Sequence, residues 1–202
     1  YKISYNIAKD NILKETTISC EKNQHLLENR MTQIENLADS IHFNLCMLCT
    51  TPEQPMSKYL DKLSSVRNNI TSIADSFNIY HVNIFLPDDS FASKEGLTFC
   101  SLSDLKKYKV QLSDFSKQGL TPNWIFRKDI SFPSIISKNK EPSGVLSCYR
   151  YAKINSQKTC LAIHITSEEL NSYLNDFPED NPSLSYVVNS EGIILSSTDK
   201  KQ

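Results

Sequence analysis

The chain has 202 residues, of which 39% are hydrophobic and 22% are charged, and its formal net charge is −1. This length accommodates one large domain or two small ones with a sizeable core. The near-neutral balance, with basic residues scattered among acidic ones, disfavours nucleic-acid binding, which requires clustered Lys and Arg. The sequence contains no run of roughly 18 or more apolar residues, so it predicts no membrane span. The chain begins with Tyr1 inside a predicted helix, from which we expect a segment of a longer protein.

Two long amphipathic helices are predicted at the start of the chain. Apolar residues within 27–48 recur at alternating spacings of four and three, a sustained heptad pattern. We predict one helix over 3–49, ended by Pro52 because proline disfavours helical geometry in the residue before it. The same spacing over 56–77 predicts a second helix and thus an antiparallel helical hairpin. The first helix is longer, so its N-terminal portion is expected to project as a stalk.

Strand-like patterns begin after the second helix. Residues 79–89 alternate in polarity and end in a Pro-Asp-Asp turn, and 97–102 are predicted to pair with them. Apolar spacing over 103–118 predicts a further helix. The segment 121–144 is irregular and carries three prolines and the only tryptophan, Trp124.

Two strong strands are predicted at 145–154 and 159–165, joined by a short connection typical of a hairpin. A short helix at 168–175 and a linker lead to a closing hairpin with its turn at 189–192. Strands joined by hairpin connections predict an antiparallel sheet, hence an α+β fold rather than a doubly wound one. The side chains of the closing hairpin expected to pack on the first helix are Tyr186, Val188, Ile193 and Leu195.

No residue pattern points to catalysis. The four glycines form no phosphate-binding motif, and the four histidines lie far apart without acidic residues at metal-ligand spacing. Cys46 and Cys49 have C-x-x-C spacing, but no second pair follows, so buried or free thiols are favoured over a zinc or redox site. We therefore expect no enzymatic activity, no cofactor and no metal in this chain.

A small-ligand site is predicted where the irregular segment meets the sheet. Its candidate residues combine aromatic faces with a charged donor, a mixture that suits small-molecule recognition. They are Trp124, Phe126, Arg127, Tyr149 and Tyr151. The alternative, that Trp124 and Phe126 only cover the face of the sheet, fits the sequence equally well. His81 and His164 lie in predicted strands, where a hydrogen-bonded sheet histidine is favoured over a ligand contact.

The order of elements resembles that of a known family. A long first helix, a helical hairpin and a PAS-like antiparallel sheet are similar to the extracellular Cache sensor domains of bacterial transmembrane receptors. The stretches that carry the resemblance are LLENRMTQIENLADSIHFNL, TPNWIFRKDISFP, GVLSCYRYAKI and KTCLAIHITSEELNSYL. The closing YVVNSEGIILSSTDK is similar to the v-x-n-x-x-G-x-I-x-x-S-x-D-K stretch of YesM-type sensor histidine kinases from Gram-positive bacteria.

The resemblance implies an extracellular domain at the cell membrane, between two transmembrane helices, that relays small-molecule binding to a cytoplasmic histidine kinase. The kinase would lie outside this chain. The parts of the domain would be a stalk and dimerisation helix (1–50), a membrane-distal PAS-like sensing domain (51–176) and a partial membrane-proximal hairpin lobe (177–202). The receptor would be a homodimer through the N-terminal helix. Alternatives are a Cache ectodomain of a chemoreceptor or diguanylate cyclase, or a helical protein-interaction module without a small ligand.

The resemblance also bears on the ligand. The amino-acid-binding Cache subgroup has Arg-x-Trp-Tyr in the pocket loop and an Asp at the end of the last strand. Here Pro122 holds the Arg place, Ile125 holds the Tyr place, and His164, a further candidate ligand contact, lies near the Asp place. A free amino acid would lose the anchors for its carboxylate and amine. The implied ligand is therefore a sugar, a peptide or an organic acid, unless there is no small molecule at all.

Overall fold

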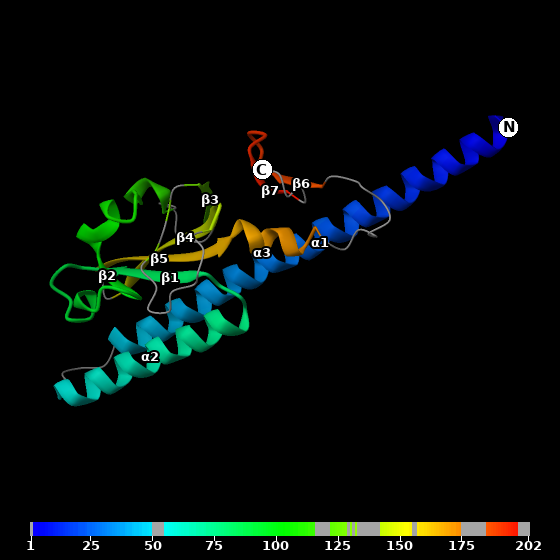
Figure 1. The fold of residues 1–202 in the computed structure, drawn as a ribbon. Helices are drawn as coiled ribbons and strands as arrows, with labels where there is room; N and C mark the ends of the chain where they lie inside the picture. The colour runs from blue at the N-terminus through cyan, green and yellow to red at the C-terminus, as the bar shows by residue number, and fades with distance from the viewer. Residues whose placement is uncertain are drawn as a thin grey trace. The chain divides into compact units, whose positions relative to one another are not determined.

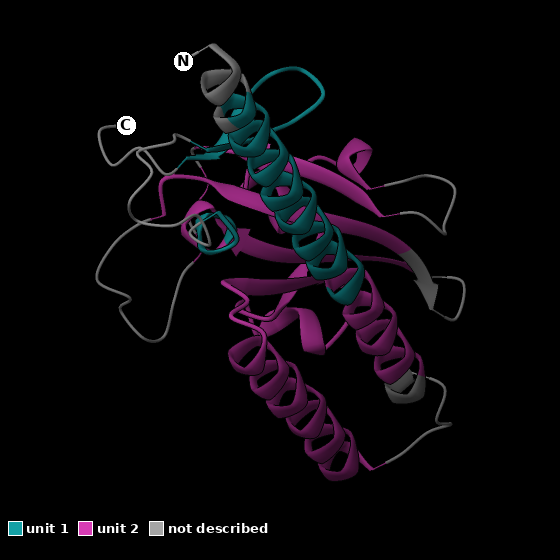
Figure 2. Ribbon diagram, turned by 90° about the vertical axis from the view of Figure 1, so that its right-hand side faces the viewer, with its two compact units in different colours: residues 1–33, 170–202 teal, residues 34–169 magenta. Residues whose placement is uncertain are grey.

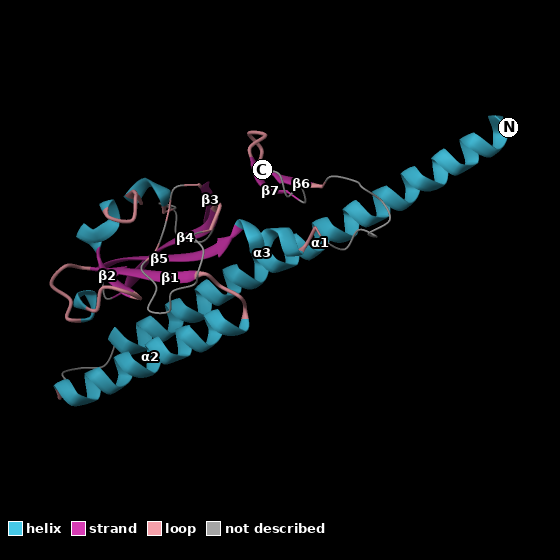
Figure 3. Ribbon diagram, viewed as in Figure 1, coloured by secondary structure: helices cyan, strands magenta, loops and turns pink. Residues whose placement is uncertain are grey.

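The structure is a computed structural model that describes residues 2–49, 55–115, 122–128, 130, 132, 142–154, 157–174 and 185–197. The chain divides into two compact units, 1–33 with 170–202 and 34–169 (Figure 2). The predicted division by role in a receptor stays a prediction. The elements, drawn in Figure 1 and Figure 3, are α1 (Lys2–Cys49), α2 (Met56–Ser76), β1 (His81–Leu86), η1 (Ala92–Lys94), β2 (Phe99–Ser101), η2 (Leu102–Lys106), η3 (Leu112–Asp114), β3 (Asn123–Arg127), β4 (Val145–Ile154), β5 (Gln157–Thr166), α3 (Ser167–Ser172), β6 (Tyr186–Val188) and β7 (Ile194–Ser197).

The helical hairpin predicted from the heptad spacing is confirmed. In the unit 34–169, the C-terminal part of α1 and the whole of α2 run antiparallel (Figure 1). A Schellman motif ends α2: the N–H of Ile79 donates to the Ala74 carbonyl at 2.8 Å, and Asn78 takes a φ of 47°. Asn adopts this left-handed conformation more readily than most residues, so the chain leaves the helix here and enters the sheet.

A five-stranded sheet in the order β2-β1-β5-β4-β3 forms the centre of the same unit. Three of its pairings are antiparallel, but β1 and β2 are parallel. The α+β class is confirmed, and the expectation of a wholly antiparallel sheet is wrong at this edge. The reason lies in the connection from β1, which contains η1 and returns the chain to the start of β2. There the Glu95 carboxylate accepts the N–H groups of Leu97, Thr98 and Phe99 at 3.1, 2.8 and 2.9 Å.

The helix predicted over 103–118 is not formed in its described part, which holds the short turns η2 and η3. Each turn begins with a capping box, in which the carboxylates of Asp104 and Asp114 accept backbone N–H groups. Lys109 between them has a φ of 53°, which an α-helix cannot continue. The apolar spacing that suggested a helix instead buries Leu105, Tyr108 and Phe115.

The sheet has a helix face and a loop face, because successive side chains of a strand point to opposite sides. On the helix face, the Trp124 indole donates to Glu35 of α1 at 2.8 Å, and Arg150 forms an ion pair with Asp39 of α1. The α1 side chains buried in this unit are Ile34, Leu37, Ala38, Ile41 and Leu45. The loop face packs under η2, η3 and the residues after β3, and its core cluster includes Phe85, Tyr108, Phe115, Ile130, Phe132, Val145 and Tyr149.

The other unit, 1–33 with 170–202, contains the N-terminal part of α1 and the hairpin β6-β7. The predicted turn is confirmed: Asn189 Oδ1 accepts the N–H of Glu191 and of Ile193 at 3.0 and 2.8 Å, and Gly192 has a φ of 78°. The exposed apolar side chains of α1 in this unit include Ile7, Ile12, Leu13 and Ile18. No helix in the described ranges has a stretch long and apolar enough to cross a membrane.

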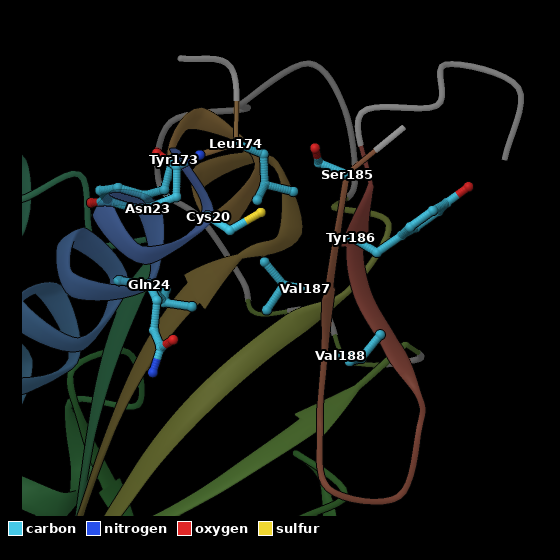
Figure 4. Close-up of a pocket in the computed structure, with 10 residues that line it drawn as sticks. Cys20, Asn23, Gln24, Tyr173, Leu174, Ser185, Tyr186, Val187 and Val188 are labelled. Carbon is cyan, nitrogen blue, oxygen red and sulfur yellow. The ribbon is translucent and has the colours of Figure 1, made fainter. Parts of the chain in front are cut away.

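The expected packing of the hairpin on the helix is wrong for three of its four residues. Tyr186, Val188 and Ile193 are 41%, 54% and 43% exposed, whereas Leu195 is 8% exposed. In Figure 4 Val187 points toward α1 and Tyr186 points away from it. A shift of one residue exchanges the two faces of a strand, and the ladder has a register irregularity between Val187 and Val188.

Candidate functional site

The candidate site lies on the loop face, where strand register aligns polar residues across the sheet. One row runs from β1 to β3 through the partners His81, His164, Ser147 and Ile125. The neighbouring row, two residues away on each strand, runs through Asn83, Ala162, Tyr149 and Asn123. Six of these eight side chains carry polar groups, which is unusual for the inner face of a sheet that only packs a core.

His164 is fully buried and hydrogen-bonded through both ring nitrogens. Its Nδ1 lies 2.7 Å from Ser147 Oγ, and its Nε2 lies 3.2 Å from Asn83 Oδ1. Asn83 Nδ2 donates to the Leu97 carbonyl at 3.1 Å, so Asn83 Oδ1 accepts from Nε2–H, and Nδ1 accepts from the Ser147 hydroxyl. Burial lowers the pKa of His164 well below its usual value, and the nearby His81 and Arg127 lower it further. The imidazole is therefore neutral at physiological pH.

Arg127 anchors the second polar group. Its Nη2 donates to Asp114 Oδ2 at 2.7 Å, and its Nη1 donates to the Tyr149 hydroxyl at 2.8 Å. The same Asp114 oxygen accepts the Gln111 N–H at 2.7 Å, and Asn123 Nδ2 donates to the Asp114 carbonyl at 2.9 Å. Burial raises the pKa of Tyr149, so the phenol stays protonated. The guanidinium charge is thus compensated by Asp114 within the site.

Aromatic rings enclose both polar groups. Phe132 lies 4.1 Å from His164 and 5.0 Å from His81 between ring centroids, and Phe115 lies 5.1 Å from Tyr149. Tyr151 is half-buried against the same cluster. Desolvation lowers the pKa of His81 as well, against the opposing effects of the Leu97 backbone and Glu95. The site is therefore aromatic and polar, and it carries no uncompensated charge among its described residues.

The structure places the six predicted site residues on two opposite faces. Arg127, Tyr149, Tyr151 and His164 share the loop face. Trp124 and Phe126 occupy the helix face, since they alternate with Arg127 along β3. Phe126 packs so closely over Gly144 that a Cβ there would lie 2.4 Å from the ring. Each of the two therefore has a packing role, and their assignment to a ligand stays a prediction.

Sequence reasoning missed three residues that complete the site. Asp114 fell within a predicted helix, and its pairing with Arg127 gave no local signal. Asn83 and Ser147 could have been found, because each is a polar residue with apolar neighbours on both sides in its strand. Their partner His164 was expected to be a hydrogen-bonded sheet histidine, and its contacts have that character.

Burial determines the chemistry available to the polar groups and thiols of the sheet. Ser147, His164 and Asn83 resemble a nucleophile, base and orienting group, but they are 1%, 0% and 0% exposed, so no substrate reaches the hydroxyl. Burial raises the pKa of the Cys148 and Cys160 thiols to about 12, which leaves both protonated and unreactive. The described residues contain no group of three or more His, Cys, Asp or Glu that could hold a metal ion.

Comparison with known proteins identifies the fold. No family model matches the sequence, and no curated protein matches it. Two solved structures of the sensory domain of the Campylobacter jejuni chemoreceptor Tlp3 (CcmL) share the architecture. The structure with isoleucine bound has 13% identity and a TM-score of 0.54 over 95% of this chain and 73% of that one. The other structure has 13% identity and a TM-score of 0.56, and the match covers 99% of this chain and 77% of that one. The chain therefore has the fold of a chemoreceptor sensory domain.

Proposed function

We propose that this chain is the extracellular ligand-sensing domain of a bacterial membrane receptor and has no catalytic activity of its own. The observation that carries the proposal is the loop face, where Arg127, Tyr149 and His164 form hydrogen-bonded polar groups inside an aromatic enclosure. Of these three, Arg127 is the half-buried group that a small molecule can reach, and the buried Tyr149 holds its guanidinium through a hydrogen bond. The fold shared with a chemoreceptor sensory domain supports the same function.

Two kinds of receptor, which differ in their cytoplasmic domain, are candidates for the protein that contains this chain. The likeness of the fold to Tlp3 favours a chemoreceptor. The closing stretch, similar to that of YesM-type kinases, favours a two-component sensor histidine kinase. In either receptor, a ligand acts only through a difference in its affinity for two arrangements of the domain.

The charge of the site bears on the ligand class. Arg127 is paired with Asp114, and both His81 and His164 have lowered pKa values, so an incoming carboxylate would have to compete with Asp114. A neutral polar ligand, such as a sugar or a small peptide, avoids this competition. One Tlp3 structure holds isoleucine, but Pro122 and Ile125 replace the expected amino-acid anchors here. We therefore favour a neutral ligand over an organic acid or an amino acid.

We also propose that the receptor is a homodimer at the cell membrane. The heptad residues Ile34 and Ile41 are each 1% exposed within this chain, so they are committed to its own core. The exposed apolar residues between Ile7 and Ile18 are a better self-association surface. Exposed apolar side chains on a helix can be covered by association with a second copy.

A thermal-shift screen of sugars, peptides, organic acids and amino acids against the 202-residue chain tests the function. A neutral ligand at about 100 times its Kd should stabilise the protein by about 2.7 kcal/mol, or raise Tm by roughly 5 to 10 °C. No stabilisation by any of the four classes would count against a small-molecule sensor. It would favour the interaction-module alternative.

A further inference from the structure

A cavity of about 420 Å³ lies within the unit formed by 1–33 and 170–202. This volume falls within the range of roughly 300 to 1,000 Å³ that is usual for small-molecule sites. One wall is a face of α1 with Cys20, Asn23, Gln24 and Leu27, and the others are the residues just after α3 and strand β6 (Figure 4). None of these residues belongs to the loop-face site.

Asn23 is the feature of this cavity that packing does not explain. It is 6% exposed, whereas Lys22 and Gln24 on either side of it are exposed. Neither its Nδ2 nor its Oδ1 has a hydrogen-bond partner among the described residues. A buried amide without partners destabilises a fold, because it loses its hydrogen bonds to water. Such a group calls for a partner that binds it.

The lining of the cavity indicates the chemistry of that partner. None of the described lining residues is Asp, Glu, Lys, Arg or His, so the site gives no charge to pair with an ion. Leu27, Leu174 and Val187 supply apolar contacts. The Asn23 side chain presents a donor and an acceptor side by side. Its complement is another amide with an N–H and a C=O on the same edge, which closes a cyclic pair of hydrogen bonds.

We propose that this cavity is a second small-molecule site, which takes an uncharged ligand with a carboxamide or lactam group on an apolar body. Asn23 binds the amide, and the apolar wall covers the body of the ligand. The site shares no lining residue with the loop-face site, and the proposal does not depend on a ligand binding there.

Benzamide is a suitable probe, with acetophenone and benzoate as matched controls. Acetophenone lacks the N–H donors, and benzoate is charged. Titration into the isotope-labelled 202-residue chain at pH 7, followed by amide resonances, should give saturable shifts centred on residues 20–27 and 185–188. Acetophenone should bind at least tenfold more weakly, and benzoate should not saturate. Shifts that do not saturate, or that centre on Arg127 and Tyr149, would overturn the proposal without any variant.

The variant Asn23→Leu tests the role of the amide. It should weaken benzamide binding at least tenfold and raise Tm, because it removes an unpartnered buried amide. The control Asn36→Leu makes the same change at an exposed position of α1 and should leave binding unchanged. If Asn23→Leu lowers Tm, or does not fold, the amide has a partner within the protein and the proposal is wrong.

Discussion

The indole N–H of Trp124 donates to the Glu35 carboxylate at 2.8 Å, and this bond ties the edge strand β3 to helix α1. Three residues further along β3, Arg127 reaches the loop face and the candidate ligand site. One short strand therefore contacts the site with one side and α1 with the other.

The Trp124–Glu35 bond should contribute to stability but not to ligand affinity. Trp124→Phe keeps an aromatic ring and removes the donor. The free energy of unfolding, measured in urea, should therefore fall by about 1.5 to 3 kcal/mol, the usual range for a hydrogen bond to a charged group. Glu35→Gln keeps an acceptor for the indole N–H and should lower the free energy of unfolding by less. Equal stability of Trp124→Phe and the wild type would show that the bond is not formed in solution.

The Arg127–Asp114 ion pair should be a strong support of the site. Asp114→Asn removes the charge that compensates Arg127 at 2.7 Å, and we expect a loss of about 1.5 to 3 kcal/mol in the free energy of unfolding. The control Asp61→Asn lies on the exposed face of α2 and should change stability little. The measurement is urea denaturation of both variants. Similar midpoints for the two would contradict the role assigned to Asp114.

Stability should fall as the pH is lowered from 6.5 toward 5. The pKa values of His81 and His164 are lowered in the folded protein, so below the ordinary histidine pKa of 6.5 only the unfolded chain binds protons at these positions. The neutral rings make their full contribution to the free energy of unfolding above pH 6.5. Below pH 6.5 this contribution decreases by up to about 1.4 kcal/mol per pH unit for each ring.

Urea denaturation at several pH values measures this slope. His81→Gln should reduce the slope, because one of the two contributing rings is removed. His25→Gln should not, because His25 is an exposed residue of α1 with 76% of its side chain accessible. A slope that His25→Gln reduces and His81→Gln leaves unchanged would contradict the account.

Two charge substitutions on α1 separate the core from the self-association surface. Ile34→Asp places a carboxylate at a site that is 1% exposed and should unfold the domain. Leu13→Asp changes a residue that is 55% exposed, so the domain should stay folded but become more monomeric in sedimentation equilibrium. A folded, monomeric Ile34→Asp variant would instead make the heptad residues an intersubunit contact.

Local patterns predicted the elements whose side chains repeat with a regular period. The heptad spacing gave α1 and α2 nearly to the residue, and the alternation around Cys148 and Ile163 gave β4 and β5. These periods follow from the geometry of one element, so they are visible without the rest of the chain.

Features that depend on distant contacts could not be predicted in this way. The parallel pairing joins Ile84 of β1 to Phe99 of β2, and no local period shows that the chain between them returns to the start of β2. Asp114 belongs to the site only because β3 places Arg127, 13 residues away in the sequence, beside it. Trp124 and Phe126 lie on the face opposite Arg127 because successive side chains of a strand alternate between its two faces. This placement can be predicted from the sequence if residues 123–127 are taken to be a strand.

A calorimetric titration of the strongest ligand from the screen into three proteins tests whether the ligand binds at Arg127 on the loop face of the sheet. These are the wild type, Arg127→Lys and Trp124→Phe. Lys keeps the charge but cannot contact two partners in one plane, so Arg127→Lys should weaken binding about tenfold or more, given about 1.5 to 3 kcal/mol for a hydrogen bond to a charged group. Trp124→Phe should bind like the wild type. Unchanged affinity in Arg127→Lys together with lost affinity in Trp124→Phe would place the ligand on the other face of the sheet and contradict the account.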